Sequence, residues 1–363
     1  MKVGVLATNW WDSRLTGIER VTVDTMRELL KCDIKNDYYE ITGNFYGLPL
    51  RKDVKEWMLT GLNVPNQIDF ACEAHKIDVM YSFFPGIQMK CPCKKVLTIH
   101  DMIPLIHPEW FVGKRYQWFD ELLRKSALEA DKIIAMSEAT KRDIIQYFGV
   151  DKNKIKVIYS GIQPSILCEK NHEDIREKFG IKGEYILSVC TIEPRKNLKG
   201  LVNAFLEYKK MHEKSDLQLV LTGKIGWGDE TVQFIMSSEK YHDDIILTDY
   251  VSDSELSHLM KNALAMAYIS FYEGFGLPIL EGMAAGKAVI SSNTSSMPEV
   301  GGDAVIYCNP YEKESIVNAI EQVTEDEDYR KTIEQRAKQR ATLFSYEKTA
   351  KQVLEVLEEV NAC

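Results

Sequence analysis

The chain has 363 residues, which suits two domains of about 150–200 residues each. Hydrophobic residues make up 45% and charged residues 27% of the chain, a composition that excludes a disordered, fibrous or collagen-like protein. The formal net charge of −9 argues against a general nucleic-acid binder. We find no apolar run long enough to span a bilayer, and the first apolar stretch is too short for a secretory signal, so we expect a cytoplasmic protein.

Short apolar runs alternate with longer amphipathic stretches along the chain. The apolar runs predict strands at residues 3–8, 78–83, 95–99, 132–136, 156–159, 185–189, 218–222, 245–247, 265–270, 288–291 and 304–307. Helical patterns between them include residues 19–30, 118–130 and 197–211. Because the apolar runs are continuous, they favour parallel strands buried on both faces, and the alternation predicts two doubly wound α/β sheets.

Two other stretches complete the predicted organisation. The polar residues 163–174 fall between the two sets of strands and are the predicted domain linker. Residues 346–360 predict one closing amphipathic helix. Ligand sites of open parallel sheets lie at the carboxyl ends of strands, and we expect the active site in the cleft between the two domains.

The eight cysteines are too sparse for a disulfide scaffold. Cys91 and Cys93 are the only close pair, and no second pair stands at the spacing of a zinc site. Reduced, packed thiols are therefore the favoured interpretation. The acidic triplet at residues 326–328 lies in a charged run typical of a solvated helix, so we favour a surface role over a metal site.

The predicted strand at 265–270 runs into a loop with two glycines and two glutamates. Gly274 and Gly276 permit unusual backbone angles and the close approach of a ligand. Pro278 suits the first turn of a helix, whose free amides would face an anion such as a diphosphate. Glu273 on the loop and Glu281 on the helix can accept hydrogen bonds from sugar hydroxyls. The alternative is a plain glycine turn with two surface glutamates.

Two further strand ends carry polar side chains. Arg195 and Lys196 follow the strand at 185–189 and would clamp a phosphate, or would simply open a basic helix. His100 and Asp101 follow the strand at 95–99. This pair would orient a substrate hydroxyl or act as acid and base, or His100 would cap the next loop as a structural histidine.

Two common nucleotide-binding motifs are only partly matched in this chain. Residues 274–279 begin like a dinucleotide-binding loop, but Ile279 stands where the third glycine belongs. Residues 282–288 have a P-loop-like outline, but the glycine spacing is one residue short and Ala288 replaces the magnesium-binding hydroxyl. We find no convincing Ser-His-Asp or Cys-His elbow.

Together these segments resemble a known family. Glu273 and Glu281, with seven residues between them inside YEGFGLPILEGMA, resemble the signature of family-4 retaining glycosyltransferases of the GT-B fold. The further matching segments, in chain order, are HD at 100–101, EPRKN at 193–197, TGK at 222–224, YVSD at 250–253 and SMPEV at 296–300. The matches span essentially the whole chain in the expected order.

The resemblance implies three parts of the chain. Residues 1–165 would form an acceptor-binding Rossmann-like domain, and residues 166–345 a Rossmann-like domain that binds a nucleotide-sugar. Residues 346–363 would form a helix that crosses back to the first domain. Such enzymes retain the anomeric configuration and need no metal, so we expect no cofactor besides the donor substrate.

The resemblance also implies roles for single residues around the donor. Arg195 and Lys196 would neutralise the diphosphate, Glu281 would hold the ribose, and Glu273 would hold the transferred sugar. The amides of Phe275, Gly276 and Leu277 would hold the transferred sugar together with Glu273, and Gly274 completes the donor-binding loop.

The remaining implied contacts lie elsewhere in the sequence. Lys224 and Val251 would lie beside the base, Gly17 near the diphosphate, and His100 near the transferred sugar. No residue is assigned as a nucleophile, because the favoured mechanism is attack on the same face that the phosphate leaves.

The segment HDMIPL at 100–105, together with EPRKN, looks most like the corresponding segments of mannosyltransferases that build bacterial surface polysaccharides. This likeness implies GDP-mannose as donor, a glycan or lipid-linked saccharide as acceptor, and peripheral contact with the inner membrane face. Three alternatives stay open: a UDP- or dTDP-sugar-dependent glycosyltransferase, a GT-B sugar-nucleotide epimerase, and a non-catalytic nucleotide-sugar-binding partner.

Overall fold

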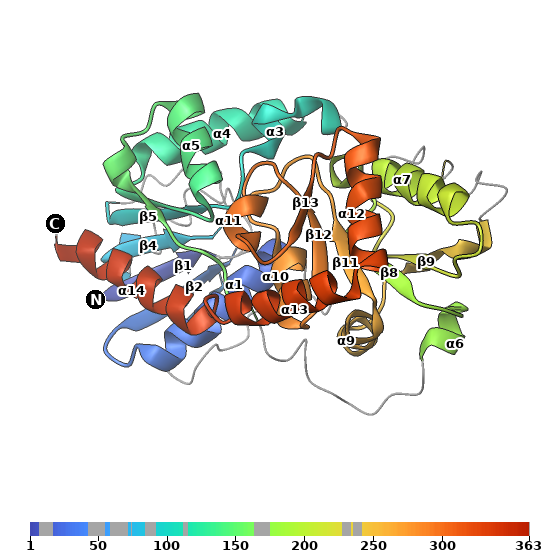
Figure 1. Cartoon of the computed structure of the whole chain (residues 1–363). Coiled ribbons are helices and arrows are strands. Elements are labelled where there is room, and N and C mark those ends of the chain that lie inside the picture. Colours follow the sequence, from blue (N-terminus) through green and yellow to red (C-terminus); the bar gives the residue numbers. More distant parts are fainter. Residues whose placement is uncertain are drawn as a thin grey trace. The chain divides into compact units, whose positions relative to one another are not determined.

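The structure is a computed structural model that describes residues 1–6, 17–42, 55–58, 72–73, 75–83, 92–111, 115–162, 175–226, 234 and 242–362. The chain divides into two compact units (Figure 1): unit 1 comprises Met1–Gly161 and Phe344–Cys363, and unit 2 comprises Ile162–Leu343. The predicted linker at 163–174 lies outside the described residues. Within the described ranges, no helix has the length and apolarity needed to cross a membrane.

Among the residues that the structure describes, unit 1 forms a seven-stranded sheet in the order β3-β2-β1-β4-β5-β6-β7. Its strands are β1 (Lys2–Leu6), β2 (Asp37–Thr42), β3 (Lys55–Met58), β4 (Val79–Ser82), β5 (Lys94–Ile99), β6 (Lys132–Ala135) and β7 (Ile155–Val157). All neighbouring strands pair in parallel. The strand order reverses between β1 and β4, which is where doubly wound sheets bind ligands.

Helices cover both faces of the unit 1 sheet. They are α1 (Gly17–Cys32), α3 (Ile103–Ile106), α4 (Arg115–Glu129), α5 (Glu138–Phe148) and α14 (Tyr346–Ala362), with short 3₁₀ turns η1 (Pro108–Trp110) and η2 (Lys152–Lys154). Val96 of β5 packs in the core with α1 and α14, whereas its neighbour Leu97 packs in the core with α4 and α5. The C-terminal helix α14 lies along α1 although the two are far apart in sequence (Figure 1).

Unit 2 contains a six-stranded parallel sheet in the order β10-β9-β8-β11-β12-β13. Its strands are β8 (Tyr185–Val189), β9 (Gln218–Thr222), β10 (Ile245–Asp249), β11 (Ala265–Tyr268), β12 (Ala288–Ser292) and β13 (Ile306–Cys308). The helical elements are α6 (Ile175–Phe179), η4 (Pro194–Lys196), α7 (Leu198–Met211), η5 (His242–Asp244), α9 (Asp253–Asn262), α10 (Leu277–Ala284), α11 (Met297–Gly301), α12 (Lys313–Glu325) and α13 (Glu327–Ala341). Here the order reverses between β8 and β11.

Local sequence signals account for several helix ends. Ser252 and Glu255 form a capping box at the start of α9, so two backbone donors of the first turn are satisfied. Gly149 ends α5 in the left-handed conformation at φ 67°, which glycine adopts without a steric penalty. Asp326 separates α12 from α13 and its side chain accepts a hydrogen bond from the Tyr329 amide. The acidic triplet therefore stands at the start of α13, the helix that the charged run predicted.

Two strands and one helix start differ from the sequence-based prediction. We did not predict β2 and β3, because DYYEIT and KEWM lack the continuous apolar run of a strand buried on both faces. They extend the sheet beyond β1, with β3 at its edge. Gly17 is the first residue of α1, two residues before the start of the helix predicted at 19–30.

The described cysteines, Cys32, Cys72, Cys93, Cys190 and Cys308, are free thiols. The Cys93 Sγ lies 3.7 Å from the Cys72 Sγ. Cys91, the other member of the predicted close pair, lies outside the described residues.

Candidate functional site

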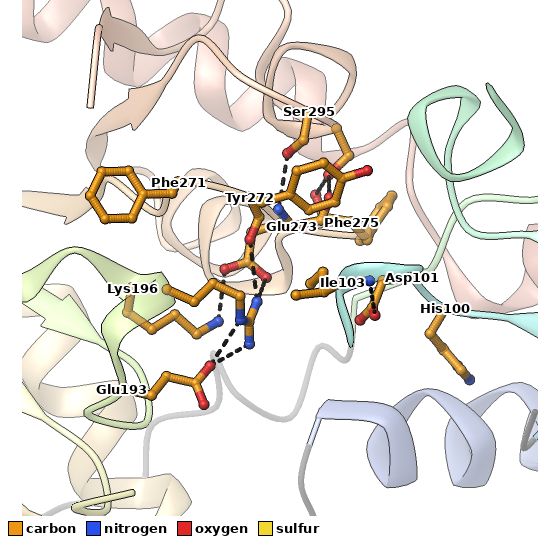
Figure 2. Close-up of polar contacts among 12 residues, drawn as sticks. His100, Asp101, Ile103, Glu193, Lys196, Phe271, Tyr272, Glu273, Phe275 and Ser295 are labelled. Carbon is orange, nitrogen blue, oxygen red and sulfur yellow. Dashed lines mark hydrogen bonds and ion pairs between the residues drawn. The ribbon is translucent and has the colours of Figure 1, made fainter. Parts of the chain in front are cut away.

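Two loops of unit 2 meet where its strand order reverses. The segment after β8 carries Glu193, Arg195 and Lys196, and the segment after β11 carries Glu273. Since β8 and β11 pair in parallel, their carboxyl ends lie at the same edge of the sheet. Figure 2 shows Glu193, Lys196 and Glu273 converging from these two segments.

Arg195 and Lys196 lie on a 3₁₀ turn, η4, that precedes helix α7. The predicted helix at 197–211 is confirmed, because α7 spans Leu198–Met211 and the two cations precede it. Asn197 separates the two elements in the left-handed conformation at φ 53°, which asparagine tolerates better than most residues. Its Nδ2 donates to the carbonyl oxygen of Pro310 at 2.8 Å, which fixes the turn to the segment after β13.

Arg195 is held by carboxylates on two sides. Its Nε and Nη2 both donate to Glu193 Oε1, at 2.9 and 2.6 Å. Its Nη1 donates to Glu273 Oε2 at 2.5 Å. The backbone is tied as well, because the Phe271 amide donates to the Arg195 carbonyl oxygen at 2.9 Å. The guanidinium is therefore fixed before any ligand arrives.

Lys196 is held by a different pair of groups. Its Nζ donates to Glu273 Oε1 at 2.8 Å and to the Tyr268 hydroxyl at 2.6 Å. The Tyr268 hydroxyl in turn donates to Glu273 Oε1 at 2.8 Å. Glu273 thus accepts from Arg195 with one oxygen and from Lys196 and Tyr268 with the other.

The cluster of Glu193, Arg195, Lys196 and Glu273 is balanced in charge, with two half-buried cations and two buried carboxylates. Glu193 is 3% and Glu273 6% exposed. Burial alone would raise the pKa of Glu273, but the charges of Arg195 and Lys196 outweigh it and lower that pKa to about 2. The carboxylate is therefore ionised throughout the physiological range, so it serves as an anchor for the cations and is a poor proton donor.

The glycine loop leads from Glu273 into α10. Gly276 is the N-cap of α10 at φ 102°, a conformation that requires glycine, and Pro278 stands in the first turn as predicted. Across the part of the chain that the structure covers, the amides of Gly276 and Leu277 have no hydrogen-bond acceptor. Such amides at a helix N-terminus suit an anionic ligand. Glu281, one turn into the helix, is 8% exposed.

The segment after β12 fixes this loop from the other side. The Glu273 amide donates to Ser295 Oγ at 2.9 Å (Figure 2). The Ser296 Oγ lies 2.9 Å from the carbonyl oxygen of Glu273 and 3.0 Å from that of Phe275. Three strand ends, those of β8, β11 and β12, therefore build one rigid site.

Lys224 and Val251 follow β9 and β10, the neighbouring strands of the same sheet. Lys224 is exposed, and its Nζ lies 5.5 Å from the centroid of the Tyr250 ring. Val251 is 6% exposed. The sheet thus brings Lys224 and Tyr250 together, and both lie on loops at the edge that carries the charged cluster.

His100 and Asp101 belong to unit 1, where they follow β5. The His100 Nε2 lies 3.0 Å from the Phe83 carbonyl oxygen, which can only accept, so Nε2 carries the proton. Burial lowers the pKa of His100 to about 4, so the ring is neutral at pH 7 and Nδ1 is unprotonated. Asp101 Oδ1 accepts a hydrogen bond at 3.0 Å from the amide of Ile103, the first residue of α3 (Figure 2). His100 can accept a hydrogen bond through Nδ1, but it is not a general acid at neutral pH.

Three residues of the unit 2 site escaped prediction as site residues: Glu193, Tyr268 and Ser295. Each lies at or just beyond the carboxyl end of a parallel strand. A polar residue at such a position is the signal that would have revealed them. Of the predicted residues, the structure brings together Arg195, Lys196 and Glu273.

Comparison with protein families agrees with this arrangement. Residues 171–340 match the model of "Glycosyl transferases group 1", and residues 16–166 match "Glycosyltransferase Family 4". The chain is also 30% identical over 264 residues to the O-antigen chain mannosyltransferase B of Escherichia coli, covering 72% of this chain and 69% of that protein. This chain is a family-4 glycosyltransferase.

Two other relatives of this glycosyltransferase are also named as mannosyltransferases. The serotype-specific mannosyltransferase WbdA of Escherichia coli is 28% identical over 275 residues, which is 73% of this chain but 33% of WbdA. The O-antigen chain mannosyltransferase RfbU of Salmonella typhimurium is 29% identical over 229 residues, or 63% of this chain and 60% of RfbU. The chain therefore spans about a third of WbdA and less than two thirds of RfbU.

Solved structures confirm the predicted fold class. HepE from Anabaena, crystallised with UDP-glucose, is 19% identical with a TM-score of 0.77, covering 99% of this chain and 100% of that chain. Sucrose-phosphate synthase from Thermosynechococcus elongatus is 15% identical with a TM-score of 0.78, covering 99% of each chain. The glycosyltransferase has the GT-B fold, with two parallel α/β sheets.

Proposed function

We propose that this glycosyltransferase is a retaining hexosyltransferase that moves mannose from GDP-mannose to a glycan or lipid-linked acceptor in surface polysaccharide synthesis. The observation that carries the proposal is the 30% identity, over 72% of the chain, to the O-antigen chain mannosyltransferase B of Escherichia coli. The pairing of Arg195 and Lys196, in the EPRKN segment, with Glu273 also supports it. We also propose a cytoplasmic enzyme with peripheral contact with the inner membrane face.

We propose that the donor diphosphate binds beside Arg195 and Lys196. The charge balance of the cluster matters here, because Glu193 and Glu273 already compensate the two cations. The extra negative charge of a diphosphate therefore also needs the amides of Gly276 and Leu277 and the positive end of the α10 dipole. In this proposal Arg195 and Lys196 orient the diphosphate and donate hydrogen bonds to it. The N-terminus of α10 supplies positive charge that no carboxylate compensates.

The other predicted contacts remain part of the proposal. Glu273 and the loop of Gly274 and Phe275 would hold the transferred sugar, and Glu281 would accept hydrogen bonds from the ribose hydroxyls. Lys224 and Val251 would lie beside the base. Gly17 would lie near the diphosphate and His100 near the transferred sugar. His100 would accept a hydrogen bond from a sugar hydroxyl through Nδ1, because its Nε2 donates to the Phe83 carbonyl oxygen.

We propose transfer on one face of the sugar. The bond between the anomeric carbon and the phosphate oxygen breaks, and a bond to the acceptor oxygen forms on the same face. The proton of the acceptor hydroxyl passes to the departing phosphate oxygen, so the protein needs no nucleophile. Arg195, Lys196 and the α10 amides stabilise the developing charge on the phosphate, and electrostatic stabilisation of this kind usually contributes most to the rate enhancement of an enzyme. The proposal requires neither a metal nor a cofactor.

A transfer assay tests this function. Purified protein is incubated in EDTA with GDP-mannose, UDP-glucose or a dTDP-sugar and an array of glycan and lipid-linked acceptors, and products are analysed by mass spectrometry and NMR. The proposal predicts a mannosylated product with the anomeric configuration of the donor. Transfer from UDP-glucose alone would overturn mannose as the sugar, and an inverted product would overturn retention. Epimerisation of the donor without acceptor would favour an epimerase, and nucleotide binding without turnover a non-catalytic partner.

A further inference from the structure

The phenol of Tyr268 lies inside the charged cluster. Tyr268 is the last residue of β11 and is 4% exposed. Its hydroxyl accepts from Lys196 Nζ at 2.6 Å and donates to Glu273 Oε1 at 2.8 Å. Because Lys196 Nζ also donates to that carboxylate oxygen at 2.8 Å, the three groups form a closed triangle of hydrogen bonds.

The triangle of hydrogen bonds fixes the orientation of the Lys196 ammonium group. An ammonium group has three N–H donors. Two of them point at Tyr268 and Glu273, and the third has no partner among the residues in the described ranges. With two donors held, the direction of the third is fixed by tetrahedral geometry. A lysine held by Glu273 alone could rotate about a single hydrogen bond and would not present a defined donor.

The Tyr268 hydroxyl keeps its proton in this environment. Burial raises the pKa of Tyr268 well above its ordinary value, and the negative charge of Glu273 raises it further. The hydroxyl therefore remains a neutral donor to Glu273 and a neutral acceptor from Lys196. It links the two ionised groups without changing the charge of the cluster.

We propose that Tyr268 is a positioning residue of the donor site: its hydroxyl directs the remaining N–H of Lys196 toward the donor phosphate and holds Glu273 in register with it. The inference rests on the proposed donor site and adds a residue to it. Lys196 Nζ also lies 5.0 Å from the centroid of the Tyr268 ring. A phenylalanine would keep that ring contact, so the hydroxyl alone can be removed.

The test compares Tyr268→Phe with Tyr185→Phe. Tyr185 is a buried tyrosine of β8 whose hydroxyl donates to the Leu259 carbonyl oxygen at 2.7 Å, away from the charged cluster. Both variants lose one buried hydroxyl, so both should lower the melting temperature. The ligand is the nucleoside diphosphate that binds wild-type protein most tightly among GDP, UDP, dTDP and ADP, and Kd is measured by calorimetry.

Tyr268→Phe should weaken nucleotide binding by about tenfold, the effect of one hydrogen bond to a charged group, whereas Tyr185→Phe should leave Kd unchanged. A double-mutant cycle adds a readout that a general packing defect would not move. In the Lys196→Met background, Tyr268→Phe should change Kd by less than about twofold, because the group that it directs is gone.

Equal Kd values for Tyr268→Phe and Tyr185→Phe would overturn the role of Tyr268 while leaving the donor site intact. An undiminished effect of Tyr268→Phe in the Lys196→Met background would also overturn it. Wild-type protein that binds none of the four nucleotides would overturn the donor site itself, and the role of Tyr268 with it.

Discussion

The two units carry different polar side chains at the carboxyl ends of their parallel strands. In unit 2, the segments after β8 and β11 meet in a cluster of four charged side chains joined by three ion pairs: Glu193, Arg195, Lys196 and Glu273. In unit 1, the buried polar side chain after β5 is His100, a neutral ring whose Nε2 bonds to a backbone carbonyl. One sheet presents fixed charge, and the other presents a hydrogen-bond acceptor.

This difference assigns the two units different tasks under the proposed function. A departing diphosphate needs positive charge and donors that are already oriented, because reorganising a charged site during the reaction costs free energy. Glu193 and Glu273 hold Arg195 and Lys196 in place for that purpose. A sugar hydroxyl is neutral, so an uncharged acceptor such as His100 Nδ1 can orient it without attracting ions.

The largest effect is expected for Lys196→Ala. The substitution removes one of the two cations beside the proposed phosphate, and kcat/KM should fall by about 100- to 1,000-fold while the fold stays intact. Lys199→Ala is the matched control, because Lys199 is exposed on α7 and its Nζ lies 5.3 Å from the Phe234 ring centroid. Steady-state kinetics and circular dichroism check both variants. Turnover of Lys196→Ala near the wild-type rate would remove the cation from the site.

Glu273→Gln should reduce both activity and stability. The amide keeps the shape of the side chain but leaves Arg195 and Lys196 without their shared counter-charge. Breaking a buried pair from one side costs about 3 kcal/mol, so the urea midpoint should fall clearly below that of wild type. Glu281→Gln serves as a comparison on α10. An unchanged transfer rate in Glu273→Gln would exclude Glu273 from the site.

The same carboxylate predicts an acid-dependent loss of stability. The folded-state pKa of Glu273 is about 2, below its ordinary value of 4.5. Its contribution is therefore fully present above about pH 4.5 and is lost as the pH falls toward 2, because only the unfolded chain takes up the proton in that window. Urea midpoints of wild type and Glu273→Gln should approach each other as the pH is lowered. Parallel curves down to pH 2.5 would contradict the pairing.

A second effect of pH on stability, in the same direction, concerns His100 in unit 1. Its pKa falls from 6.5 to about 4 in the folded state. Between these values the unfolded chain binds a proton and the folded chain does not, so stability should fall as the pH drops below 6.5, by at most about 3 kcal/mol. NMR titration, with the signal assigned by comparison with His100→Gln, should show an uncharged ring at pH 6. A ring that titrates near pH 6.5 would restore His100 as an acid–base candidate.

The smallest effect is expected for Lys224→Ala. Lys224 is exposed, so water screens its charge, and its contact with the Tyr250 ring is weak. We expect donor KM to rise by about two- to fivefold with little change in kcat. A large fall in kcat would show that this edge of the site takes part in the reaction step.

The sequence predicted the strands of the two sheet interiors well, because buried parallel strands are continuous apolar runs. It missed β2 and β3, whose polar residues hide them from that criterion. For the site, the sequence identified Arg195, Lys196 and Glu273 but described the cations as a bare phosphate clamp. The pairing of these cations with Glu273 and Tyr268 could not be predicted, since it joins side chains 72 to 78 positions apart in sequence and depends on the turn geometry of η4.

Under the proposed function, unit 2 binds a nucleoside diphosphate at the paired cations. The most direct measurement is the thermal unfolding of wild type and Lys196→Ala with millimolar GDP, UDP, dTDP or ADP in EDTA. A ligand at a hundred times its Kd stabilises by about 2.7 kcal/mol, which is a readable shift. We expect stabilisation of wild type, greatest with GDP, that is largely lost in Lys196→Ala. No stabilisation by any nucleotide, or an equal shift in both proteins, would contradict it.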